Sequence, residues 1–101
     1  MSIDIFCYTS LCATDAEEIL SALKSSEPVL FGDVFDVSRA RAAEYYDQES
    51  ISRFGMVASS MFVLYLNDKD QIACTSDAAR LVKQKFGEQS VVVLFNNDVR
   101  I

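Results

Sequence analysis

Residues 61–66 read Met-Phe-Val-Leu-Tyr-Leu, an uninterrupted apolar run of strand length. A strand with one face in water alternates apolar and polar residues, whereas a strand that is apolar throughout is covered on both faces. The run ends at Asn67-Asp68-Lys69-Asp70, a cluster of turn-forming residues. The stretch therefore predicts a buried strand of a layered fold with helices on its sheet.

The segments that follow this strand predict a hairpin, a helix and a further strand. The turn at 67–70 leads into a short strand expected over Gln71 to Cys74. Thr75 or Ser76 is placed to cap a helix that ends at Gly87, and its apolar stripe consists of Ala78, Leu81, Val82 and Phe86. Val91 to Phe95 is a second apolar run, which predicts a final buried strand.

The N-terminal part of the chain predicts a strand followed by a helix. Ile3 to Tyr8 alternates two sets of side chains, which is typical of a strand. Thr14 and Glu17 have the spacing of a capping box, in which each side chain satisfies a free backbone N–H of the other residue. The helix should end by Ser25-Ser26, because Pro28 disfavours helical geometry in the residue before it.

The middle of the chain predicts a turn, a second strand and a long helix. We expect a turn over Pro28 to Gly32 and a second strand over Asp33 to Val37. Ser38 can then cap a helix that runs to Phe54 and would be the longest of the chain, with Gly55 in the left-handed position after it.

The resulting order is β-α-β-α-β-β-α-β, and 101 residues suit one domain over residues 1–101. Strands that alternate with helices imply a mostly parallel or mixed sheet, because each helix carries the chain back across the sheet. The expected fold class is α/β, with α+β as the alternative. We expect a central mixed sheet of four to five strands with three helices.

The charge of −6 is concentrated in the first 38 residues, where seven acids accompany one base, Lys24. An acidic field repels nucleic acids and anionic membranes and attracts basic partners, although acidity also simply aids solubility. The chain shows no apolar run of about 18 residues and no signal-peptide pattern at its start. Three cysteines are an odd number and do not indicate a disulfide framework, so a cytoplasmic location is expected.

The residue types needed for common catalytic and cofactor sites are missing. The chain has no histidine, the commonest general base and metal ligand, and its three glycines are too far apart for a phosphate-binding loop. Cys7 and Cys12 are too widely spaced for a thioredoxin-like Cys-x-x-Cys pair, and Cys7 shares the apolar face of its strand, as expected for a buried thiol. Cys74 has the same interpretation. We therefore expect no catalytic residue, metal or cofactor.

The helix predicted around residues 44–49 combines acids with two adjacent tyrosines. Tyr45 and Tyr46 are about 100° apart around a helix, so both cannot point fully into the core. An exposed tyrosine beside carboxylates would suit a basic protein partner. The alternative is a core Tyr46 and a partly exposed Tyr45 without a role.

Several segments together resemble small bacterial immunity proteins of contact-dependent growth inhibition systems. They are Ile3-Asp4-Ile5-Phe6-Cys7-Tyr8, Glu27-Pro28-Val29-Leu30-Phe31, Ala58-Ser59-Ser60-Met61-Phe62-Val63, Leu66-Asn67-Asp68-Lys69 and Val92-Val93-Leu94-Phe95-Asn96-Asn97. The resemblance spans most of the chain without a sharp motif. It implies a non-enzymatic cytosolic protein that binds a cognate toxin domain, often a nuclease acting on RNA, one-to-one over the active site.

A nuclease presents a basic surface to phosphates, so an acidic inhibitor gains association rate and complementarity. The residues expected to contact the toxin are Asp33, Asp36, Tyr45, Asp47, Glu49, Asp68 and Asp70. Two other readings stay open. One is a homo-oligomeric adaptor or structural subunit, and the other is a divergent thioredoxin-like protein that uses Cys7 or Cys12.

Overall fold

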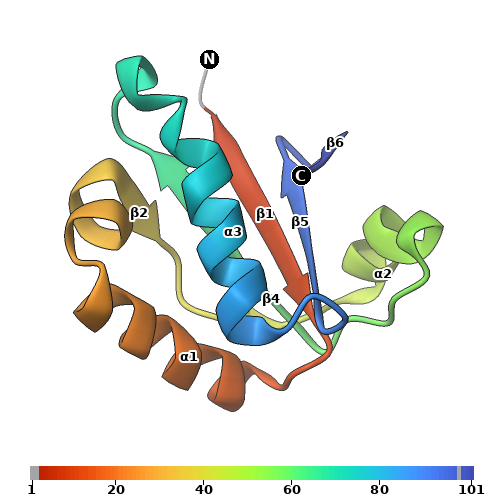
Figure 1. Cartoon of the computed structure of the whole chain (residues 1–101). Helices are drawn as coiled ribbons and strands as arrows, with labels where there is room; N and C mark the ends of the chain where they lie inside the picture. The colour runs from red at the N-terminus through yellow and green to blue at the C-terminus, as the bar shows by residue number, and fades with distance from the viewer. Residues whose placement is uncertain (1–2, 98) are drawn as a thin grey trace.

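One antiparallel sheet organises the chain in the computed structural model, which describes residues 3–97 and 99–101. β1 (Asp4–Thr9) lies in the middle of the sheet, between β4 (Ser60–Leu66) and β5 (Val91–Phe95) (Figure 1). β2 (Phe35–Val37) and β3 (Arg41–Ala42) pair with opposite ends of β4. β6 (Val99–Arg100), which the sequence did not predict, pairs with β5.

The three α-helices and the central sheet confirm the α/β class, but the direction of pairing differs from the expectation. Every pairing between the described strands is antiparallel. α3 (Cys74–Phe86) does carry the chain from β4 to β5, and these two strands run in the same direction. They do not touch, because β1 lies between them and pairs antiparallel with both. The chain thus crosses between two strands that run parallel but are not hydrogen-bonded to each other.

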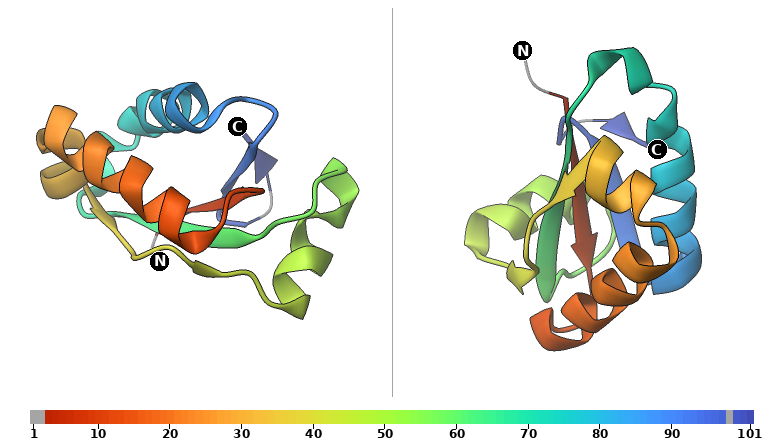
Figure 2. Two further views of the ribbon diagram at one scale, coloured as in Figure 1. Left: turned by 90° about the horizontal axis from the view of Figure 1, so that it is seen from below. Right: turned by 90° about the vertical axis from the view of Figure 1, so that its left-hand side faces the viewer.

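Helices cover the two faces of the sheet unequally. α1 (Ala13–Ser26) and α3 lie on one face, and α2 (Tyr45–Ile51) lies on the other, over only one end of the sheet (Figure 2). The run 61–66 divides accordingly: Phe62 and Leu64 join the core under α1 and α3, whereas Met61 and Val63 join a second core that includes Ile51 of α2. The prediction of a strand covered on both faces is confirmed for residues 61–64, whereas Tyr65 is 43 % exposed.

The predicted ends of two helices are confirmed, but the predicted caps are wrong. α1 ends at Ser26 and α3 ends at Phe86, next to Gly87 with a φ of 92°. The residue at the N-cap of α1 is Cys12, and the Glu17 carboxylate accepts a hydrogen bond from the backbone N–H of Ala40 at 2.9 Å. The predicted capping box needs the same Glu17 carboxylate, which is engaged instead by a distant segment of the chain. α3 begins after Ala73, without a side-chain cap.

The segment between α1 and β4 differs most from the prediction. A wide helical turn, η1 (Val29–Val34), takes up residues expected in the second strand, so β2 has three residues. Ser38 caps no helix, because its Oγ accepts a hydrogen bond from the N–H of Val63 on β4 at 2.8 Å. The chain then stays extended through β3. The expected longest helix is the shortest of the three α-helices, with seven residues.

Two predictions on either side of this region have opposite outcomes. Gly55 follows the short helix η2 (Ser52–Phe54) with a φ of 75°, which confirms the left-handed position. The hairpin after β4 is wrong: residues 69–71 form the short helix η3 (Lys69–Gln71), and no strand forms over 71–74. The Asp68 carboxylate accepts the N–H of Asp70 at 2.9 Å and begins that helix instead.

Candidate partner-binding site

The seven residues predicted to contact a partner lie in two groups, at opposite ends of β4. Asp33, Asp36, Asp68 and Asp70 gather at the end that pairs with β2. Tyr45, Asp47 and Glu49 lie on α2, which follows β3 at the other end. Six of the seven are exposed, and Asp47 is the exception.

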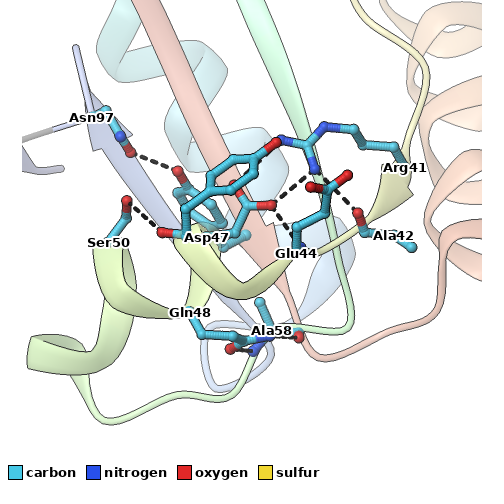
Figure 3. A network of polar contacts seen from close by, with 10 residues as sticks. Arg41, Ala42, Glu44, Asp47, Gln48, Ser50, Ala58 and Asn97 are labelled. Carbon is cyan, nitrogen blue, oxygen red and sulfur yellow. Dashed lines mark hydrogen bonds and ion pairs between the residues drawn. The ribbon is translucent and has the colours of Figure 1, made fainter.

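Asp47 is buried and holds α2 in place. Its side chain is buried and receives both terminal nitrogens of the Arg41 guanidinium, at 2.8 and 3.2 Å (Figure 3). It also accepts the backbone N–H of Glu44 at 2.8 Å, and Glu44 completes the capping box of the helix. The hydrogen bond to Asp47 raises the pKa of Arg41 above its ordinary value. The structure thus places Asp47 inside the chain, and a direct contact of Asp47 with a partner stays a prediction.

Further polar contacts fasten α2 to the sheet. Gln48 donates through Nε2 to the carbonyl of Ala58 and accepts the Ala58 N–H at 3.0 Å (Figure 3). Beneath the helix, the Tyr8 hydroxyl donates to Asn97 Oδ1 at 2.7 Å. Burial, followed by the nearby charge of Asp47, raises the pKa of Tyr8. A helix of seven residues gains little stability from its own backbone, so the contacts of Asp47 and Gln48 help to position it.

Both tyrosines of α2 are exposed, Tyr45 by 80 % and Tyr46 by 55 %, so the alternative of a core Tyr46 is wrong. The Arg41 guanidinium lies 5.8 Å from the centre of the Tyr46 ring. Val57, which sequence reasoning missed, is 77 % exposed.

At the other end of β4, Asn67 joins two of the predicted acids. Its Nδ2 donates to the Asp33 carbonyl at 3.0 Å and to Asp36 Oδ1 at 3.2 Å. Asn67 follows β4, and β2 pairs beside it. The turn is thus held together by polar contacts, while its carboxylates face solvent. This arrangement brings exposed negative charge to one end of the sheet.

The cysteines occupy three different environments. Cys7 is fully buried, as predicted, and burial raises the pKa of its thiol strongly. Cys12 is exposed, and Cys74 is half-buried. Within residues 3–97 and 99–101, no group of three or more His, Cys, Asp or Glu could hold a metal ion. None of the helices described is long and apolar enough to cross a membrane.

The fold and the site define a small α/β domain whose open surfaces combine tyrosines with carboxylates. The family model of the CDI system immunity component matches residues 1–99, and the chain belongs to this family. The chain is 31 % identical over 100 residues to the immunity protein CdiI-2 of Burkholderia pseudomallei (strain 1026b), covering 99 % of each. The resemblance predicted from the sequence is confirmed.

A solved structure agrees with this assignment. The chain is similar to a chain of the CdiA-CT/CdiI toxin and immunity complex from Burkholderia pseudomallei, with a TM-score of 0.91 and 30 % identity. The similarity covers 97 % of this chain and 95 % of that chain. It therefore extends over nearly all of the fold.

Proposed function

We propose that this chain binds a cognate contact-dependent growth inhibition toxin one-to-one and neutralises it by covering its active site. The observation that carries the proposal is the match to a chain of a solved toxin and immunity complex over 97 % of this chain. Membership of the immunity component family supports it. The proposed action is contact without turnover, in the cytoplasm, with no direct contact to nucleic acid or membrane.

We further propose that the toxin is a basic nuclease directed at RNA, such as tRNA. A nuclease must attract phosphates, so its active-site surface is positively charged. The net charge of −6 suits such a partner. The proposed contacts are the exposed residues Asp33, Asp36, Tyr45, Glu49, Asp68 and Asp70. Asp47 contributes indirectly, because it positions α2.

The proposal predicts that a toxin domain is encoded immediately upstream of this chain, and the test uses that domain. Purified toxin should form a one-to-one complex with the chain in size-exclusion chromatography with light scattering, and its cleavage of tRNA should stop at equimolar chain. Toxin alone and toxin with an unrelated immunity protein serve as controls. Absence of an upstream toxin, or active toxin in the presence of excess chain, would contradict the proposal. A stable homo-oligomer that does not bind the toxin would favour the alternative of a homo-oligomeric adaptor or structural subunit.

A further inference from the structure

The register of the sheet places two aspartates on either side of a tyrosine. Asp36 on β2 pairs with Tyr65 on β4, and Tyr65 pairs in turn with Asp4 on β1. Directly paired residues of antiparallel strands project from the same face of the sheet. Asp36, Tyr65 and Asp4 therefore form a line across three neighbouring strands, which we call the Asp-Tyr-Asp row.

The row lies on the face opposite α1 and α3, where α2 leaves one end of the sheet uncovered. Tyr8 and Met61 on this face lie in the core with Ile51 of α2, at the far end of the strands. Figure 2 shows no helix over the other end of this face, where β4 meets β2. Tyr65 is 43 % exposed there, and Asp36 is exposed.

The Asp4 carboxylate has unused hydrogen-bonding capacity. Its Oδ1 is buried and has no hydrogen-bond partner among the residues that the structure describes. The backbone of the same residue is satisfied, since its N–H donates to Asn96 Oδ1 at 3.0 Å and its carbonyl accepts the Asn96 N–H at 2.7 Å. A buried oxygen without a donor is costly, and that cost falls when the Asp4 carboxylate turns toward a donor supplied by a partner.

The surroundings of the row distinguish it from α2. On the α2 side, two aromatic rings already carry arginines of this chain: Arg41 lies over Tyr46, and Arg53 and Arg100 lie over Phe54. Asp36, by contrast, accepts a hydrogen bond from the amide of Asn67. Because that amide is neutral, the contact does not compensate the negative charge of the carboxylate. The row also stands on paired strands, so little conformational entropy is lost when it binds.

We infer that the Asp-Tyr-Asp row is the docking site for a cationic segment of the toxin, with an arginine stacked on Tyr65. A planar guanidinium can lie on an aromatic ring while its N–H groups donate to carboxylates beside the ring. Asp4 and Asp36 place carboxylates on both sides, and Asp4 Oδ1 has no donor among the residues that the structure describes. This inference rests on the proposed function, because its occupant is the toxin.

The test compares the toxin affinity of row variants with that of matched variants on the opposite face. Isothermal titration with the upstream-encoded toxin domain should give a Kd about 30-fold higher for Tyr65→Ala, the effect of losing a tyrosine hot spot. The pair Asp4→Asn/Asp36→Asn should raise Kd by about the same factor and weaken its dependence on salt. The pair Asp15→Asn/Glu18→Gln removes two exposed charges from α1, and Val29→Ala trims an exposed side chain. Both controls should stay within about threefold of wild type.

Thermal unfolding checks that each variant is folded, and chemical-shift mapping on the wild-type chain gives an independent reading. Toxin addition should shift the backbone amides of residues 4, 36 and 65 more than those of α1. Row variants that bind within about threefold of wild type, with no shifts at these amides, would overturn the inference while leaving the proposed function intact. A wild-type dimer that Tyr65→Ala dissociates would also overturn it, by making a second copy the occupant. Failure of the wild-type chain to bind the toxin would refute the proposed function itself.

Discussion

Replacing Asp47 with alanine should destabilise the fold by loosening α2. The change removes the acceptor of two hydrogen bonds from Arg41, at 2.8 and 3.2 Å, and of one from the Glu44 N–H, at 2.8 Å. The Arg41 side chain is 41 % exposed, so water replaces much of what the ion pair contributes, and that pair is worth about 1 kcal/mol. Loss of the helix cap adds about 1 kcal/mol.

The expected loss of unfolding free energy for Asp47→Ala is therefore about 2 kcal/mol, which lowers the Tm of a domain of this size by about 10 °C. Asp47→Asn keeps an oxygen for the Glu44 N–H and should cost only about 1 kcal/mol. Glu49→Gln, an exposed change on the same helix, should stay within about 0.5 kcal/mol of wild type.

Urea unfolding followed by far-UV circular dichroism measures these differences, and an unchanged m-value shows that the denatured state is comparable. The reasoning would be refuted if Asp47→Ala unfolded within about 0.5 kcal/mol of wild type, or if Glu49→Gln lost as much as Asp47→Ala. Either result would mean that the buried carboxylate does not hold the helix.

Three further predictions concern the cysteines and glycines. Burial raises the pKa of Cys7 above its ordinary 9.0, so the folded chain retains a proton that the unfolded chain releases. The unfolding free energy should therefore fall above about pH 9, by about 1.4 kcal/mol per pH unit more in the wild-type chain than in Cys7→Ala. Urea unfolding at several pH values measures this, and an equal dependence on pH in the two proteins would contradict it. Iodoacetamide should label exposed Cys12 rapidly and Cys7 only on unfolding, as mass spectrometry can show; rapid labelling of Cys7 would place it outside the core. Gly55→Ala should cost about 1 kcal/mol because its φ is 75°, whereas Gly32→Ala, which also meets no neighbouring atom, should be neutral or slightly stabilising in thermal unfolding; equal effects would argue against backbone strain at Gly55.

The sequence predicts local structure correctly where burial is complete or where a residue has one conformational role. The apolar run 61–66 predicted a buried strand, and residues 61–64 are indeed covered on both faces. Gly55 was recognised because a left-handed residue after a helix is energetically easy for glycine alone. Family resemblance was likewise readable, since it depends on many weakly constrained positions along the whole chain.

Local motifs failed where distant segments compete for the same groups. Glu17 has the spacing of a capping box, but its carboxylate binds the N–H of Ala40 instead. Ser38 resembles a helix cap, but its hydroxyl binds the N–H of Val63. The sequence predicted Asp47 to be a surface acid, but in the structure Arg41 and the N-terminus of α2 enclose it. In each case, a contact formed only after folding outweighed a local preference.

The sequence by itself determined the three central strands, which of their faces are apolar and how much negative charge the chain carries. Only the tertiary structure decided that β1 lies between β4 and β5, and that Asp36, Tyr65 and Asp4 stand in one row. The physical reason is that alternation along a strand shows which side chains share a face, whereas the neighbours across strands depend on the pairing of segments far apart in the chain.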